Sequence, residues 1–168
     1  MILLRSLGAL VVLTIIVSTA SAQAPDKPVW LPFEQALEQG KKSGKMIVVD
    51  VWSPTCGWCR KMQEEVYPRS ELLTYLNDKF VTGRLDIGVR DDTLQYLGYT
   101  LSSAELSVGF GAQGTPTTVF LAADGSYITR LPGFHDFDSY MPVLQFIGSQ
   151  SFRDMTFEEY VETTAGSK

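Results

Sequence analysis

Residues 46–59 have the sequence MIVVDVWSPTCGWC, and the expected architecture follows from them. The apolar run Met46–Val51 is typical of a buried strand, and Arg60–Val66 behind it predicts a helix. Cys56 and Cys59 are the two cysteines of the chain, and the second stands where the helix opens. A cysteine pair three positions apart at a strand–helix junction indicates a redox-active dithiol.

A sulfur at the start of a helix is favoured as a thiolate. The first turn has backbone N–H groups without partners, and its end of the helix dipole is positive. The dipole alone is typically worth about 0.3–1 kcal/mol, less than the ~1.4 kcal/mol of one pKa unit, so hydrogen bonds must supply the rest of any lowering of the pKa of Cys56. The thiolate attacks disulfides, and Cys59 can then resolve the mixed disulfide.

Length, composition and the N-terminal sequence predict one exported domain. The chain has 168 residues, 45% of them hydrophobic, enough for a single domain with a substantial core. Residues 1–22 predict a signal peptide: Arg5 precedes the apolar segment Leu7–Val17, and Ala20–Ala22 fits a small-residue cleavage site. An uncleaved anchor is the alternative, although the apolar segment is shorter than the ~20 residues that a spanning helix needs. We expect cleavage after Ala22.

Charge and residue counts narrow the function classes. The net charge is −5 and no Lys/Arg cluster occurs, so we expect no nucleic-acid partner. Two Cys and one His are too few for a structural zinc site, and haem attachment would need a His where Arg60 follows Cys59. We expect neither a metal nor a cofactor. A purely structural disulfide is disfavoured because so short a loop constrains the unfolded chain little.

The order of the expected elements predicts an α/β domain. After an extended, proline-rich lead-in at residues 23–32, the domain is expected over 33–163. We expect residues 88–103 to be an excursion with at most one short helix. Ser103 is then expected to cap the following helix, which runs through Phe110. Expected helices are 33–42, 60–67, 71–79, 103–110, 138–147 and a short terminal one opened by a capping box at Thr156 and Glu159; expected strands are 46–52, 80–87, 117–122 and 126–131.

The connections between these strands predict a mixed sheet. The strand–helix–strand order of 46–87 implies a parallel pair, and Asp124-Gly125 is a strong hairpin signal, which makes 126–131 antiparallel to 117–122. We expect a central mixed β-sheet with helices on both faces. The dithiol then lies at the carboxyl end of a central strand, where open α/β sheets place their sites.

Three separate motifs resemble the thioredoxin superfamily. Val49–Trp52, followed by the dithiol and Arg60, matches the family's strand, aromatic residue, cysteine pair and basic residue. Phe110–Thr117 matches the segment that carries the family's cis-proline, and Gly133 stands where the family has a glycine after its hairpin. The match covers roughly residues 33–150 and implies the thioredoxin-like fold.

A closer similarity is to the periplasmic thioredoxins of the SoxW type. It rests on Thr115–Phe120, Arg130–Phe134 and Phe157–Tyr160, and on the insertion before the proline segment. This resemblance implies a periplasmic location and a reductant fed by a membrane electron donor. The dipeptide between the cysteines, Gly57-Trp58, differs from the Gly-Pro of ordinary thioredoxin, so the redox potential does not transfer.

Asp50 is a candidate proton acceptor. It is a carboxylate inside an apolar strand, so burial should raise its pKa and suit it to take the proton of Cys59 during resolution. The resemblance implies the same role. It also places Arg84 opposite Asp50 on the next strand, and a purely structural ion pair is the alternative interpretation.

Four residues are candidates for substrate binding. Trp52 and Trp58 flank the dithiol and are suited to an apolar rim, with Trp52 expected to pack under the loop and Trp58 to be exposed. The resemblance implies that a cis Pro116 leaves the backbone of Thr115 free beside Cys56 to pair with an extended substrate. A proline at the first position of a strand is the alternative.

The sequence therefore predicts an exported, monomeric thiol–disulfide oxidoreductase acting on protein disulfides or dithiols, Cys56 being the nucleophile and Cys59 the resolving thiol. Two alternatives remain. One is a copper-handling periplasmic protein that uses the cysteines and His135. The other is a non-catalytic adaptor that holds a peptide in the same groove.

Overall fold

The computed structural model describes residues 26–166 of the chain. The predicted signal peptide and its cleavage site after Ala22 lie outside these residues. Within them, no helix combines the length and the apolar character that crossing a membrane requires.

A five-stranded mixed sheet forms the centre of the molecule. Its strand order is β1–β3–β2–β6–β7. Strand β3 pairs in parallel with both β1 and β2, while β6 pairs antiparallel with β2 and β7, which confirms the predicted mixed sheet. The bounds are β1 Leu31–Pro32, β2 Met46–Trp52, β3 Phe80–Asp86, β6 Thr117–Leu121 and β7 Tyr127–Pro132.

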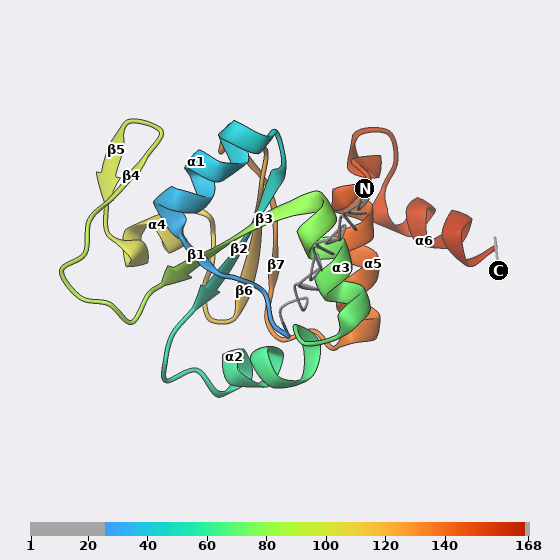
Figure 1. Cartoon of the computed structure of the whole chain (residues 1–168), viewed down its shortest axis with the longest axis horizontal. Helices are drawn as coiled ribbons and strands as arrows, with labels where there is room; N and C mark the ends of the chain where they lie inside the picture. Colours follow the sequence, from blue (N-terminus) through green and yellow to red (C-terminus); the bar gives the residue numbers. More distant parts are fainter. Residues whose placement is uncertain (1–25, 167–168) are drawn as a thin grey trace, which may run out of the picture.

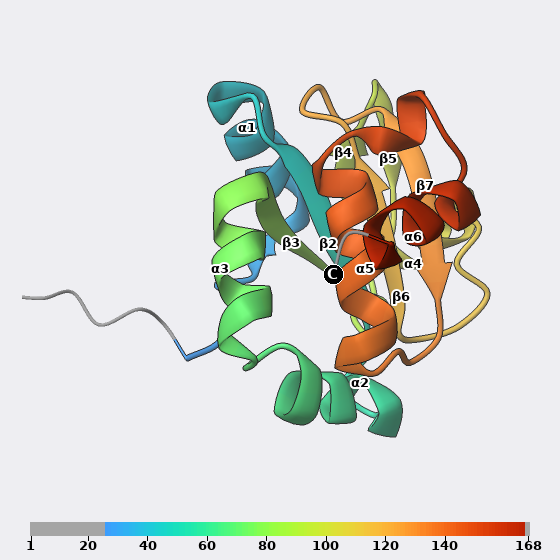
Figure 2. The same ribbon diagram turned by 90° about the vertical axis from the view of Figure 1, so that its right-hand side faces the viewer.

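Helices cover both faces of this sheet, as Figure 1 shows with α1 and α4 on one side and α3 and α5 on the other. In Figure 2, α3 and α5 lie in front of the strands, and α2 lies at one end of the sheet. The helical segments are α1 Phe33–Ser43, α2 Gly57–Lys61, the π-helical η1 Met62–Val66, α3 Ser70–Lys79, α4 Ser103–Gly109, α5 Phe137–Gly148, the 3-10 turn η2 Ser151–Arg153 and α6 Phe157–Ala165.

The continuous apolar run of β2 explains why it is central. Successive side chains of a strand point to opposite faces. Ile47, Val49 and Val51 accordingly enter the core under α1 and α4, and Val48 enters the core under α3 and α5. Asp50 lies on the same face as Val48, so its carboxylate is directed toward the helices that follow the cysteines.

The excursion at residues 88–103 differs from the prediction. The limit of at most one short helix holds, but the excursion also contains a two-stranded hairpin that was not predicted, β4 (Leu94–Tyr96) and β5 (Tyr99–Leu101). Tyr96 holds the hairpin to the core, because its ring contacts Phe33 and Phe110 and its hydroxyl donates to the Gly125 carbonyl at 2.9 Å. These contacts come from distant parts of the chain, and the local sequence gives no sign of them.

The caps and the lead-in also refine the expected boundaries. Ser102, not Ser103, caps α4, since its hydroxyl accepts from the N–H of Glu105 in a capping box. The lead-in contains β1, which pairs with the middle of β3. The predicted capping box at Thr156 and Glu159 is confirmed at the start of α6.

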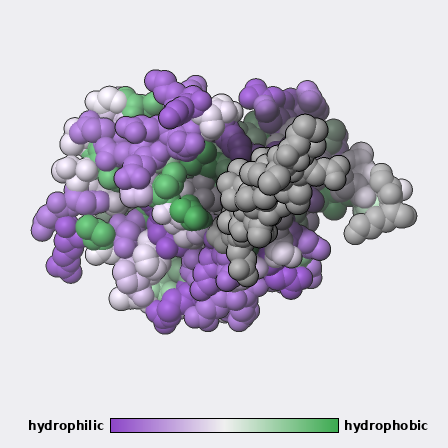
Figure 3. Space-filling model, in the orientation of Figure 1, coloured by the Kyte–Doolittle hydropathy of each residue, from purple (hydrophilic) through white to green (hydrophobic). Residues whose placement is uncertain are grey.

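The surface seen in Figure 3 is mainly hydrophilic, with small, separate hydrophobic areas. The larger exposed apolar side chains are scattered over several elements. They include Val29 before β1, Leu97 and Tyr99 in the hairpin, Val108 on α4 and Trp58 on α2.

Candidate dithiol active site

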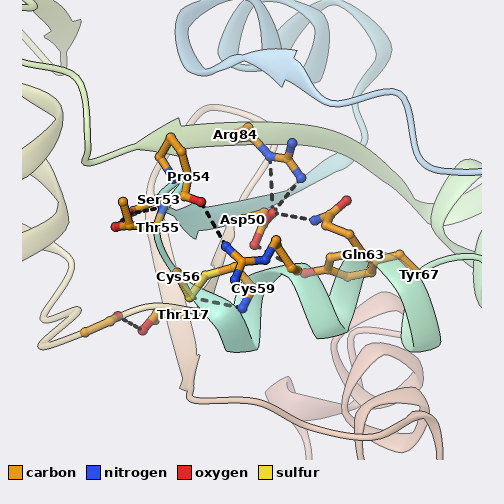
Figure 4. Close-up of a disulfide and its surroundings, with 12 residues drawn as sticks. Asp50, Ser53, Pro54, Thr55, Cys56, Cys59, Gln63, Tyr67, Arg84 and Thr117 are labelled. Carbon is orange, nitrogen blue, oxygen red and sulfur yellow. Dashed lines mark hydrogen bonds and ion pairs between the residues drawn. A yellow bond between two sulfur atoms is a disulfide. The ribbon is translucent and has the colours of Figure 1, made fainter.

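The two cysteines lie where β2 gives way to α2. After β2 ends at Trp52, the Cys56 N–H donates to the Ser53 carbonyl at 3.1 Å and closes a tight turn. Cys56 is the N-cap of α2, and its Sγ accepts the Cys59 N–H at 3.0 Å. The same group would bind a thiolate on Cys56 in the reduced protein, which is the interaction expected at a helix N-terminus. In the structure the two sulfurs form a disulfide (Figure 4).

The two cysteine residues differ in their exposure to solvent. Cys56 is half-buried, whereas Cys59 is only 1% exposed. A partner's disulfide can therefore reach the sulfur of Cys56, and Cys59 is protected inside the first turn of α2. This asymmetry is the one that the predicted roles of nucleophile and resolving thiol require.

Asp50 lies behind the dithiol with its carboxylate almost fully enclosed, at 1% exposure. Its Oδ2 accepts from Arg84 Nη2 at 2.9 Å and Nε at 3.2 Å, and from Gln63 Nε2 at 3.1 Å. The Tyr67 hydroxyl donates to Oδ1 at 3.3 Å. Figure 4 shows these donors converging on Asp50 from β3 and from the helix after Cys59.

Burial raises the pKa of Asp50 above its usual value of 3.8. The charge and hydrogen bonds of Arg84, and the hydrogen bonds of Tyr67 and Gln63, act in the opposite direction without cancelling this effect. Burial and the Asp50 charge raise the pKa of Tyr67 far above its usual range, so its hydroxyl stays protonated and donates. The expected ion pair with Arg84 is present, but burial is the larger influence.

Three supporting residues were missed by the sequence reasoning. Gln63 and Tyr67 hold Asp50, and Trp30 Nε1 donates to Gln63 Oε1 at 3.2 Å. Cys59, Gln63 and Tyr67 follow one another at intervals of four residues, which places all three on one side of a helix. This spacing could have indicated Gln63 and Tyr67. Nothing near Trp30 in the sequence indicates its role.

Arg84 is fixed from both sides by tryptophans. Its guanidinium carbon lies 4.9 Å from the ring centre of Trp30 and 4.4 Å from that of Trp52. Trp52 thereby lines a hollow with Arg84 and Asp86, away from Trp58. The structure therefore places Trp52 apart from the other three residues predicted to bind substrate.

Those other three residues meet at a different hollow. Trp58, Thr115 and Pro116 line a hollow of about 330 Å³ together with Gly133 and Phe134. The Thr115–Pro116 peptide bond is cis, as the resemblance implied. Trp58 is 58% exposed, and its ring centre lies 5.3 Å from that of Phe134. This arrangement provides an apolar wall next to the turn that carries Cys56.

The described residues give the copper alternative no support. Across residues 26–166, no three His, Cys, Asp or Glu side chains form a group that could hold a metal ion. His135, the third ligand that the alternative needs, has its Nε2 3.1 Å from the Pro132 carbonyl.

A comparison with protein-family models matches residues 33–148 to the family described as the Thioredoxin-like domain. This chain belongs to the thioredoxin-like family. Solved structures confirm the fold of this thioredoxin-like protein. A thioredoxin-fold protein from Helicobacter pylori aligns with a TM-score of 0.61 at 20% identity, over 75% of this chain and 88% of the other. A thioredoxin from Thermus thermophilus gives 0.60 at 22%, over 72% and 87%.

A third structure is more similar in sequence. A protein from Bacteroides thetaiotaomicron proposed to be a disulphide-isomerase gives a TM-score of 0.58 at 26% identity, over 77% of this chain and 98% of the other. None of these similarities tests the closer resemblance to SoxW-type thioredoxins, which stays a prediction.

Curated relatives of the thioredoxin-like protein are much longer than it. An uncharacterized protein of Caenorhabditis elegans is 31% identical over 102 residues, which are 60% of this chain and 13% of that protein. Spermatogenesis-associated protein 20 of Rattus norvegicus is 36% identical over 64 residues, 38% of this chain and 8% of that protein. The chain thus spans a small part of these relatives.

Proposed function

We propose that this thioredoxin-like protein is a thiol–disulfide oxidoreductase that exchanges its Cys56–Cys59 pair with cysteines of partner proteins. The observation that carries the proposal is the half-buried residue Cys56 at the start of α2, whose Sγ accepts the Cys59 N–H at 3.0 Å. The similarity to the Bacteroides thetaiotaomicron protein proposed to be a disulphide-isomerase supports it.

The reaction has two exchange steps. The Cys56 thiolate attacks one sulfur of the partner's disulfide, forming a mixed disulfide and releasing the other partner sulfur as a thiolate. Cys59 then loses its proton and attacks the Cys56 sulfur, which forms the Cys56–Cys59 disulfide and releases the second partner sulfur. Two electrons pass to the partner, and an external dithiol must reduce the protein for another cycle.

Asp50 suits the second step. It is a buried carboxylate with a raised pKa on the inner side of the dithiol, where Cys59 is also buried. A base of this kind accepts a proton most effectively when its pKa is close to the working pH. We assign the proton of Cys59 to Asp50.

Location and direction are further parts of the proposal. Residues 1–22 have the pattern of a signal peptide, so we propose export to the periplasm, with cleavage after Ala22. There the protein would act as a monomeric reductant supplied by a membrane electron donor. The potential difference between donor and acceptor fixes the direction, since about 30 mV corresponds to ~1.4 kcal/mol for a two-electron couple.

Trapping with the Cys59→Ser variant tests the function. Attack by Cys56 should leave a partner or an oxidised peptide covalently attached, because the resolving thiol is missing. The adduct is detected as a mass increase that dithiothreitol reverses. The matched control is Cys56→Ser, whose remaining sulfur is buried and should trap nothing.

Two results would contradict the proposal. A Cys59→Ser protein that forms no adduct, together with a wild type that reduces no peptide disulfide, would remove the oxidoreductase function. Unchanged binding of a partner by the Cys56→Ser, Cys59→Ser double variant, together with a wild type that reduces no disulfide of that partner, would instead favour the adaptor.

A further inference from the structure

Two neighbouring hollows meet at the cis Thr115–Pro116 peptide. The hollow of about 330 Å³ at Trp58 and the hollow of about 200 Å³ at Arg130 share three residues, Thr115, Pro116 and Gly133. We call them together the Thr115 groove. Because the shared residues lie in the middle, the ends of the groove carry different side chains and offer different chemistry.

One end of the Thr115 groove is aromatic. Trp58 and Phe134 form its wall, with ring centres 5.3 Å apart. Lys61 Nζ lies 5.4 Å from the ring centre of Trp58 and 5.0 Å from that of Phe134, and it also pairs with Glu65 at 3.7 Å. The positive charge of Lys61 is thus already shared with a carboxylate and two rings, which leaves the exposed ring of Trp58 as the contact surface.

The other end is cationic. Arg130 lies on β7, and its guanidinium packs against Gly111, where a Cβ would come within 2.7 Å of Nη1. Gly111 has φ of +71°, a conformation that favours glycine. Arg130 Nη1 donates to the Tyr127 hydroxyl at 3.4 Å, and the Tyr127 ring stacks on Phe110 with an interplanar angle of 14°. These contacts hold the guanidinium at the mouth of the groove.

Arg130 is available to a ligand. The ion pairs found within residues 26–166 involve Lys61, Lys79 and Arg84, and none of them reaches Arg130. Arg130 is exposed, and a guanidinium binds a carboxylate through two parallel N–H bonds. The ion pairs of the described residues thus leave the charge of Arg130 without a carboxylate partner.

We propose that the Thr115 groove selects extended cysteine-containing segments that carry an apolar or aromatic side chain toward Trp58 and Phe134 and an Asp or Glu toward Arg130. The inference rests on the proposed oxidoreductase function and adds its substrate class. The exchange at Cys56 is unchanged by it. Arg130 and Trp58 determine which partner segments stay long enough to react.

Peptide selectivity tests the groove. The Cys59→Ser protein is mixed with oxidised homodimers of single-cysteine peptides, and the rate of adduct formation on Cys56 is followed by mass. The peptides place Asp, Asn or Lys within about four residues of the cysteine on either side, because an extended chain advances roughly 3.3 Å per residue. Each peptide carries Phe or Ala on the other side of its cysteine.

We expect the best Asp peptide to react about two- to five-fold faster than its Asn counterpart, the range of an exposed ion pair, and the Lys peptide to react more slowly than Asn. Replacing Phe by Ala should slow the same peptide. Arg130→Gln should bring the Asp-to-Asn ratio close to one, Arg130→Glu should invert it, and Arg130→Lys should keep part of it. Arg153→Gln, with the same charge change on the distant η2, is the matched control.

The outcomes separate this inference from the proposed function. Equal rates for Asp, Asn and Lys at every position, with normal adduct formation, would overturn the groove assignment and leave the oxidoreductase intact. A preference for Asp that survives Arg130→Glu would overturn it as well. If no peptide forms an adduct, the proposed function fails and the groove assignment fails with it.

Discussion

Asp50 has a carboxylate that is enclosed but well provided with hydrogen bonds. Burial disfavours its charge, while Arg84, Gln63 and Tyr67 stabilise the charged form. The balance leaves the pKa raised, so the group is a stronger base than a surface aspartate. A base at this depth is useful only to a group that is also buried, and Cys59 is such a group.

At the residue scale, we predict that Asp50→Asn slows the second exchange step. The amide cannot accept the proton of Cys59, and proton transfer by a placed side chain typically contributes 10²-fold or more, so we expect a decrease of roughly 10²-fold near neutral pH. Single-turnover kinetics should show the mixed disulfide accumulating. The wild-type rate should rise with pH as Asp50 ionises, and the variant should lack this rise.

The control is Glu64→Gln, which removes an exposed carboxylate from η1. It should leave both steps unchanged. If the Asp50→Asn protein resolved the mixed disulfide at the wild-type rate, Asp50 would have only a structural role, as the partner of Arg84 in an ion pair. This is the alternative that the sequence left open.

The individual site residues were predictable to different degrees. Cys56, Cys59 and Asp50 could be named as candidates because their residue types and spacing indicate redox chemistry, and Arg84 was placed opposite Asp50 by resemblance. Gln63 and Tyr67 were missed, since polar and aromatic residues after a cysteine pair are common on helices for other reasons. Trp52 was grouped with Trp58 because both flank the dithiol in sequence, although the turn at Ser53 separates their side chains.

At the element scale, the contact between α1 and the sheet depends on a glycine. Gly83 lies in the middle of β3, and a Cβ at this position would lie 2.6 Å from the Ala36 Cβ of α1. Real Cβ atoms do not approach so closely, so a larger residue forces the helix away from the sheet. Ala36 is itself fully buried, which leaves no free space for adjustment.

We predict that Gly83→Ala lowers the free energy of unfolding by about 1–3 kcal/mol, the usual effect of overpacking a core. Urea denaturation measures the change. Gly109→Ala at the end of α4 is the matched control, because nothing lies within 4 Å of its would-be Cβ. A loss of stability in the control equal to that of Gly83→Ala would contradict the packing argument.

Elements with long apolar patterns were predicted well, and short ones were not. β2 has the predicted bounds, and the helix predicted at residues 33–42 extends one residue further, to Ser43. The β4–β5 hairpin was missed because strands of three residues carry too little pattern, and Tyr96 stabilises it through contacts far along the chain. The π-helical turn η1 has no sequence signal that we could name.

At the scale of the whole molecule, the pKa of Asp50 affects stability. Because its pKa is raised in the folded state, the protonated carboxyl is favoured there over the unfolded chain. The contribution of Asp50 to the free energy of unfolding is therefore complete below its usual value of 3.8 and is lost as the pH rises through the folded-state value. The wild type therefore becomes less stable as the pH rises from the usual pKa of Asp50 to its pKa in the folded state.

We predict that the stability of Asp50→Asn, measured relative to the wild type, increases with pH across this window and then becomes constant. Denaturant titrations from about pH 3 to about pH 8 measure the difference, and the uncharged amide has no titration of its own. A difference that decreases with pH would mean that the pairing with Arg84 outweighs burial, so that the pKa is lowered.

The overall architecture was the most predictable level. Apolar periodicity indicated the main helices and strands, and the resemblance supplied their arrangement, which the strand order and the match over residues 33–148 confirm. The lead-in was expected to be merely extended, yet Leu31–Pro32 joins the sheet as β1. Such short pairing depends on the position of β3 and not on the sequence of the lead-in.

Both outer strands of the sheet end in a proline, Pro32 on β1 and Pro132 on β7. A proline offers no N–H to a chain lying alongside, and the charge of Arg130 on β7 further discourages such pairing. Copies of the protein should therefore not join border to border into ribbons. The outer strands of the sheet thus limit association between copies of the chain, while the cis Thr115–Pro116 segment lies apart from both of these edges.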